Sequence, residues 1–122
     1  MNTKILIVDD EKDLRDVLKD RFEQEPFEVL VASDGSEAVE MVGKNRPSII
    51  IMDVMMPVLN GIEAKRIIRK KGCNIPIIFM TIKPKDEIID EMDENTFYME
   101  KPINVKELRT IIIRQIASLP PN

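Results

Sequence analysis

Short apolar runs alternate with longer segments of helical period five times along the chain. The runs lie at Lys4–Val8, Phe27–Val31, Ser48–Met52, Pro76–Met80 and Thr96–Met99. Runs that are rich in β-branched residues and nearly unbroken in hydrophobicity are typical of strands buried on both faces of a sheet. Their alternation with helices predicts an α/β fold with a doubly wound parallel sheet, because each parallel pair needs a right-handed crossover.

The segments between the runs predict amphipathic helices. Pro26 and Pro47 end the first two, Asn60-Gly61 predicts a turn before the third, and Pro84 begins a short fourth helix. The fifth is expected at Val105–Ser118. The apolar positions expected on the buried faces of the first four helices are Leu14, Val17, Leu18, Phe22, Ala38, Val39, Val42, Ile62, Ile67, Ile68, Ile88, Ile89 and Met92.

The length of 122 residues predicts one domain over residues 1–122, and 43% hydrophobic content is enough for one core. Residues 119–122, with Pro120-Pro121, could begin a linker. The chain has no apolar run near the roughly 18–20 residues of a membrane span, and its start lacks a signal-peptide pattern. We therefore expect a soluble protein in the cytoplasm.

Several kinds of chemistry are excluded by composition. The chain has no His and a single Cys73, so an imidazole base, a His-dependent triad, an internal disulfide and a thiolate metal cluster are all ruled out. A formal charge of -4 argues against direct nucleic-acid binding by this domain. Any chemistry must use carboxylates, hydroxyls, lysines and a borrowed ion.

Polar residues stand at the carboxyl ends of the predicted strands. Asp9 and Asp10 follow the first strand, Asp53 the third and Thr81 the fourth, while Lys101 comes soon after the fifth. In open α/β sheets, ligands bind at this edge, near the point where the winding direction reverses. A strand order of 2-1-3-4-5 would gather all five side chains in one pocket.

Three clustered carboxylates need positive charge. At an effective dielectric constant near 20, a like-charge pair at 4 Å costs about 4 kcal/mol. Carboxylates, a main-chain carbonyl and waters are the oxygen ligands that Mg²⁺ prefers, and Mn²⁺ could substitute. Lys101 would supply a second positive charge.

Further residues complete a pattern of fixed order and spacing. These are Val8-Asp9-Asp10-Glu11, Asp53 followed by Met55-Met56-Pro57 and Asn60-Gly61, Thr81, Tyr98 and Lys101-Pro102. With this set the chain, from Lys4 to about Ser118, resembles the response regulator receiver domain, the phosphoacceptor module of two-component signalling. The resemblance implies a flavodoxin-like, CheY-like (βα)₅ fold with three α/β/α layers.

The resemblance also implies roles for the strand-end residues. Asp53 would be the phosphoacceptor nucleophile, receiving a phosphoryl group from the phosphohistidine of a histidine kinase or a histidine phosphotransfer protein. Asp9, Asp10, Asp53 and the backbone carbonyl of Met55 would hold Mg²⁺. Lys101 would pair with Asp53 at rest and with the phosphoryl group afterwards. The absent His is then expected, because the donor brings it.

Thr81 and Tyr98 would form the switch. The Thr81 hydroxyl would donate to the phosphoryl group, and Tyr98 would move inward, changing a face made by the fourth helix, the fifth strand and the fifth helix. That face could form a homodimer, and a C-terminal effector domain could lie outside this chain. The domain would catalyse only its own phosphorylation and dephosphorylation, and would not be an enzyme that acts on a separate substrate. The resemblance also implies that the Lys101–Pro102 peptide bond is cis.

Other functions remain open at this point. If Ile82 closes the pocket, the chain would be a phosphorylation-independent interaction domain. A Mg²⁺-dependent phosphatase with an aspartyl nucleophile would need a second Asp where Met55 stands. A flavodoxin-type cofactor binder would need a phosphate loop rich in Ser, Thr and Gly, whereas Asp9-Asp10-Glu11 would repel phosphate.

Overall fold

The computed structural model describes residues 3–118, so the predicted linker start at 119–122 lies outside the described residues. Within them the strands are β1 (Thr3–Val8), β2 (Phe27–Ala32), β3 (Ile49–Asp53), β4 (Ile77–Thr81) and β5 (Thr96–Glu100). The helices are α1 (Lys12–Glu23), α2 (Gly35–Asn45), α3 (Gly61–Lys70), α4 (Lys85–Ile88), the 3₁₀ turn η1 (Ile89–Glu91) and α5 (Val105–Ala117). The predicted alternation of strands and helices is confirmed.

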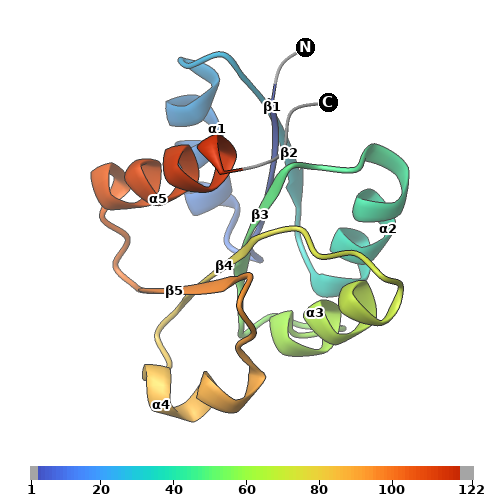
Figure 1. The fold of residues 1–122 in the computed structure, drawn as a ribbon. Coiled ribbons are helices and arrows are strands. Elements are labelled where there is room, and N and C mark those ends of the chain that lie inside the picture. The colour runs from blue at the N-terminus through green and yellow to red at the C-terminus, as the bar shows by residue number, and fades with distance from the viewer. Residues whose placement is uncertain (1–2, 119–122) are drawn as a thin grey trace.

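All strand pairs are parallel, and the strand order is β2-β1-β3-β4-β5. The sheet forms the central layer, with α1 and α5 on one face and α2 and α3 on the other (Figure 1). The predicted doubly wound, CheY-like α/β/α architecture is therefore confirmed.

Two apolar clusters hold the layers together, and side chains alternate between them along each strand. In β1, Leu6 and Val8 face the cluster with α2, α3 and α4, while Ile5 and Ile7 face the cluster with α1 and α5. Burial on both faces explains why the strands appear as unbroken apolar runs rather than alternating ones.

Three apolar residues expected on buried helix faces lie outside the core. Val17 in α1 is 58% exposed, and Ile67 in α3 and Ile89 in η1 are also exposed. Each is next in sequence to a fully or almost fully buried residue, and consecutive helical residues differ by about 100° around the axis. Only one of each pair can face the sheet, so the prediction was wrong at these positions.

The fourth helix is as short as the sequence predicted. Four residues of α4 are followed by the three of η1, and Ile88 is the one buried side chain that these two short helices contain. The predicted turn at Asn60-Gly61 is instead the start of α3. Asn60 caps this helix by accepting from the Glu63 N–H at 2.9 Å, and the Glu63 carboxylate accepts from the Asn60 N–H in return.

Candidate functional site

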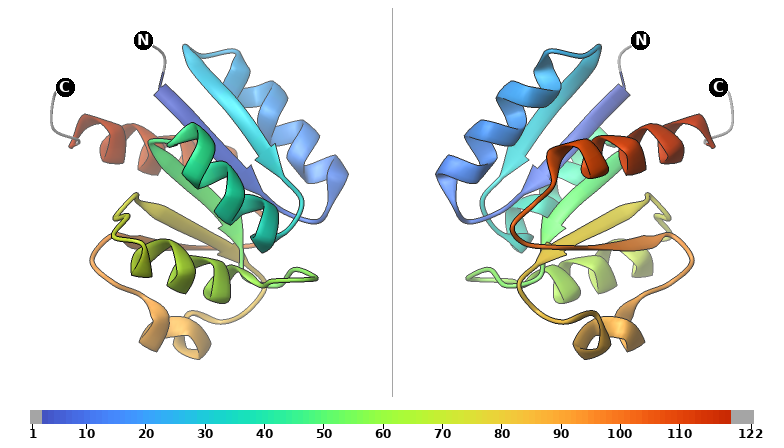
Figure 2. Two further views of the ribbon diagram at one scale, coloured as in Figure 1. Left: turned by 90° about the vertical axis from the view of Figure 1, so that its right-hand side faces the viewer. Right: turned by 90° about the vertical axis from the view of Figure 1, so that its left-hand side faces the viewer.

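The predicted polar residues lie at the carboxyl ends of the parallel strands. In Figure 2 this is the end of the sheet toward which the strand arrowheads point. Asp53 and Thr81 are the last residues of β3 and β4, and Asp9 follows the last residue of β1. Beyond the end of β5, the Lys101 N–H donates to the Thr81 carbonyl oxygen at 2.9 Å. The Lys101–Pro102 peptide bond is cis, as the resemblance implied.

Lys101 joins two carboxylates from different strands. Its Nζ atom lies 2.8 Å from Asp9 Oδ2 and 2.8 Å from Asp53 Oδ2. The Lys101 side chain is only 13% exposed, and Asp9 is fully buried. Burial opposes the charge on Lys101, but its bonds to Asp53 and Asp9 outweigh this effect and raise the pKa of the ammonium group.

The site holds more negative than positive charge. Carboxylate oxygens of Asp9, Asp10 and Asp53 lie within 4.8 Å of one another. Burial raises the pKa of the Asp53 carboxyl, although hydrogen bonds from Lys101 and the Met55 N–H pull it down. Three clustered carboxylates against one ammonium suit a hard divalent cation with oxygen ligands, so these residues fit Mg²⁺ or Mn²⁺.

A cavity of about 190 Å³ opens onto Asp53. This volume is several times the roughly 30 Å³ that one water molecule occupies in the liquid, so a group of a few heavy atoms has room there. Ile82 lines the cavity but is 67% exposed, and its side chain leaves the cavity open. The lining residues are Asp10, Glu11, Asp53, Met55, Ile82 and Lys101.

Two residues support the site from outside the carboxylate cluster: Arg15, which was not singled out from the sequence, and Gly61, which was named there only as part of a turn and of the motif pattern. Arg15 Nη1 in α1 donates to the Asp9 carbonyl oxygen at 2.7 Å, and the Gly61 N–H donates to the Val54 carbonyl oxygen at 2.9 Å. A Cβ atom at Gly61 would overlap the Asp53 carbonyl oxygen. Only the glycine after the capping Asn60 could have suggested this close approach, and nothing in the sequence indicates the Arg15 contact.

The two predicted switch residues both form hydrogen bonds with the backbone of Lys83. Thr81 is buried, and its Oγ1 accepts from the Lys83 N–H at 3.1 Å. Tyr98 is half-buried, and its hydroxyl donates to the Lys83 carbonyl oxygen at 2.6 Å. The backbone of Lys83 thus connects the end of β4 with β5.

No helix between residues 3 and 118 combines the length and the hydropathy that a membrane span requires.

The sequence matches the response regulator receiver domain family over residues 5–113. Two relatives are each 36% identical over 110 residues: the alkaline phosphatase synthesis transcriptional regulatory protein PhoP of Bacillus subtilis and the response regulator MprA of Mycobacterium ulcerans. The matches cover 88% of this chain but 46% and 47% of those proteins. The chain therefore spans about half the length of these relatives.

Solved structures show the same fold at similar size. A response regulator receiver domain from Francisella is 33% identical, with a TM-score of 0.83 and 95% of both chains covered. The chemotaxis protein CheY4 of Vibrio cholerae is 30% identical, with a TM-score of 0.84, covering 93% of this chain and 98% of its own. A receiver domain from Clostridium thermocellum is 30% identical, with a TM-score of 0.85 and 94% of both chains covered.

Proposed function

Because this chain belongs to the response regulator receiver domain family, we propose that it accepts a phosphoryl group on Asp53 from the phosphohistidine of a histidine kinase or a histidine phosphotransfer protein. The observation that carries the proposal is the Lys101 ammonium group, which lies 2.8 Å from both Asp53 and Asp9 beside the exposed Asp10. An open cavity leads to this cluster.

The transfer exchanges one bond to phosphorus for another. A carboxylate oxygen of Asp53 attacks the phosphorus atom, a P–O bond forms and the P–N bond breaks. The electron pair of the P–N bond stays on the imidazole nitrogen, which takes a proton from solvent. Hydrolysis later returns the Asp53 carboxylate and inorganic phosphate. The domain would thus act only on itself, as a signalling module rather than an enzyme with a separate substrate.

The neighbours of Asp53 would stabilise the charge on the phosphoryl oxygens. Lys101 already donates to Asp53 and would donate to a phosphoryl oxygen after transfer. The Thr81 hydroxyl would donate to another, giving up its bond with the Lys83 N–H. Asp9, Asp10, Asp53 and the Met55 carbonyl would hold Mg²⁺, or Mn²⁺ in its place. The bound ion would supply positive charge against the phosphoryl oxygens.

The switch would pass through Lys83. If Thr81 turns toward the phosphoryl group, the backbone of Lys83 loses one partner, and its bond from Tyr98 must adjust. The face made by α4, β5 and α5 would report this change to a partner, including a second copy of the chain.

We extend the proposal to a cytoplasmic location, to a single receiver domain over residues 1–122 and to an effector domain beyond this chain.

Incubation with acetyl phosphate and Mg²⁺, followed by intact mass measurement, tests the proposal. Wild type should gain one phosphoryl group, and Asp53→Ala should gain none. Asp86→Asn removes an exposed carboxylate of α4 outside the cavity and is the matched control, which should be phosphorylated like wild type. Chelation of divalent cations should abolish the gain. Phosphorylation of Asp53→Ala, or none of wild type even with a cognate kinase, would contradict the proposal.

A further inference from the structure

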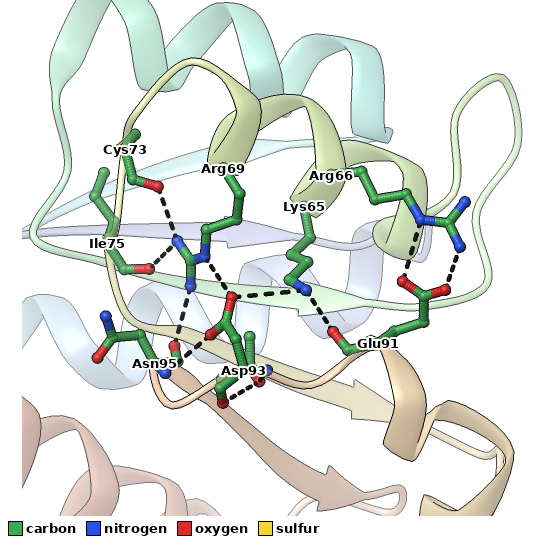
Figure 3. A network of polar contacts seen from close by, with 9 residues as sticks. Lys65, Arg66, Arg69, Cys73, Ile75, Glu91, Asp93 and Asn95 are labelled. Atoms are coloured by element: carbon green, nitrogen blue, oxygen red, sulfur yellow. Dashed lines mark hydrogen bonds and ion pairs between the residues drawn. The ribbon is translucent and has the colours of Figure 1, made fainter.

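A network of polar contacts joins α3 to the segment that follows α4, away from the acceptor site (Figure 3). Lys65, Arg66 and Arg69 reach from α3 toward residues 91–96, which we call the connecting segment. We call Lys65, Arg69 and Asp93 the anchor cluster. The residues that these contacts join are about 25 positions apart in sequence, so the contacts depend on how the chain folds and not on local backbone geometry.

Arg69 is the centre of the network. Its Nε atom donates to Asp93 Oδ2 at 2.8 Å, and its Nη2 donates to the Asn95 carbonyl oxygen at 3.2 Å. Its Nη1 donates to the carbonyl oxygens of Cys73 at 3.1 Å and Ile75 at 2.7 Å. With a side chain only 14% exposed, Arg69 fixes the connecting segment and the loop before β4 to the same helix.

Lys65 is a second, more deeply buried cation on α3. Its side chain is 11% exposed, and its Nζ atom donates to the Glu91 carbonyl oxygen at 2.5 Å and lies 3.6 Å from Asp93 Oδ2. A buried ammonium group that loses its partner is costly, so departure of the connecting segment would leave an uncompensated charge. The outer pair, Arg66 with Glu91, is more exposed and adds less.

Asp93 forms ion pairs with both cations and also stabilises the turn that precedes β5. Partial burial opposes its ionisation, but hydrogen bonds from Arg69 and the Asn95 N–H hold the pKa of its carboxyl below the usual range. Its own N–H donates to Thr96 Oγ1 at 2.7 Å. The Ile77 N–H donates to the Asn95 carbonyl oxygen at 2.9 Å, so the turn leads directly into the pairing of β4 with β5.

Residues 82–90 are held much more weakly. Ile82 and Ile89 are exposed, the single turn of α4 has no side-chain cap, and Ile88 is its one buried side chain. The Tyr98 hydroxyl bond to Lys83 is the polar tie from this segment to β5. A hollow of about 630 Å³ lies between this segment, α3 and the loop that follows β3. Segments with few buried contacts open at lower free energy than well-packed ones.

We propose that the anchor cluster holds the connecting segment on α3, so that residues 82–90 form the movable part of the face made by α4, β5 and α5, and residues 91–96 stay fixed. The anchor also sets the start of β5, an edge strand paired on one side only, at the end opposite to Lys101. The existence of the anchor does not depend on phosphorylation, whereas the confinement of movement to residues 82–90 rests on the proposed function.

Amide hydrogen exchange of the unphosphorylated chain, measured by NMR, tests the anchor. In wild type, amides of residues 93–97 should exchange more slowly than those of 83–90. Asp93→Asn should speed exchange at 93–97 by about tenfold, as expected for loss of a charged hydrogen bond. Glu94→Gln is the control, because Glu94 has the same charge and makes no side-chain hydrogen bond or ion pair within residues 3–118.

A second variant keeps the test decisive if Asp93→Asn unfolds. Arg69→Lys retains the positive charge but loses the planar fork, so exchange at 93–97 should again rise while α1 and β1 stay protected. Unchanged exchange at 93–97 in both variants, or an equal effect of Glu94→Gln, would overturn the anchor.

Phosphorylation with acetyl phosphate and Mg²⁺ tests where movement occurs. Amide chemical shifts should change strongly across 82–90 and little across 91–96, and Asp93→Asn should spread the changes into 91–96. Equal changes across both segments in wild type would overturn the confinement. If intact mass shows no phosphoryl group, the proposed function fails, and the exchange measurements still decide whether the anchor exists.

Discussion

At the scale of single residues, Asp53 has an environment that suits reactivity and costs stability. Burial raises the pKa of its carboxyl, with Lys101 and the Met55 N–H opposing. An acid whose pKa is higher in the folded state binds its proton more tightly there than in the unfolded chain. Its contribution to stability is therefore full below the ordinary Asp pKa and is lost as pH rises through the folded-state pKa. The direction of this pKa shift predicts that the charge on Asp53 lowers the free energy of unfolding at neutral pH.

Replacing Asp53 by Asn should therefore raise the free energy of unfolding at pH 7 without divalent cations, by about 1 kcal/mol, the usual size of a single stabilising substitution. Added Mg²⁺ should stabilise wild type, because it binds the folded carboxylate cluster, and should stabilise Asp53→Asn much less. Urea unfolding with chelator and with Mg²⁺ measures both effects. Asp86→Asn, at an exposed position, is the control and should behave like wild type. A less stable Asp53→Asn in chelator would contradict the argument.

At the scale of elements, the loop between β3 and α3 brings the start of α3 against the end of β3. Gly61 is the first residue of α3, and a Cβ atom there would overlap the Asp53 carbonyl oxygen, whereas nothing lies within 4 Å of a Cβ atom at Gly43 in α2. Of these two helical glycines, only Gly61 lacks space for a side chain.

Gly61→Ala should lower the free energy of unfolding by roughly 1–3 kcal/mol, since backbone atoms must shift. It should also slow phosphorylation, because the shift falls on Asp53, the proposed nucleophile. Gly43→Ala should instead stabilise the protein by about 0.5–1 kcal/mol and leave phosphorylation unchanged. Urea unfolding and time-resolved intact mass measure both properties. Normal phosphorylation of Gly61→Ala would show that the contact does not position Asp53.

The element scale also shows how far the sequence leads. Every strand was predicted within one residue of its observed ends, because burial on both faces leaves an unbroken apolar run. The clustering of Asp9, Asp10, Asp53 and Lys101 was predicted from the topology, because parallel strands end on the same side of a sheet. The anchor cluster was not predicted, because a pair such as Arg69 and Asp93 is set by how α3 lies against the end of η1. No periodicity or spacing in one sequence encodes that contact.

At the scale of the whole molecule, the carboxylate cluster is distinct from the face made by α4, β5 and α5, which is proposed to bind partners. The carboxylate cluster lies at the carboxyl ends of the strands, and Lys83 connects Thr81, at the end of β4, with Tyr98 in β5. The large apolar side chains exposed on η1 and α5 are Ile89 and Ile113. Obligate dimer interfaces are large and more apolar than the rest of the protein surface, whereas this face exposes two large apolar side chains.

The unphosphorylated chain should therefore be a monomer at micromolar concentration in sedimentation velocity. If the α4, β5 and α5 face forms the proposed homodimer, acetyl phosphate with Mg²⁺ should produce a dimer in wild type and none in Asp53→Ala. Ile113→Gln should weaken that dimer, because it removes apolar area from α5. Ile67→Gln alters an exposed apolar residue of α3 and should leave it unchanged. A dimer that forms equally in Asp53→Ala would separate assembly from phosphorylation and contradict the coupling.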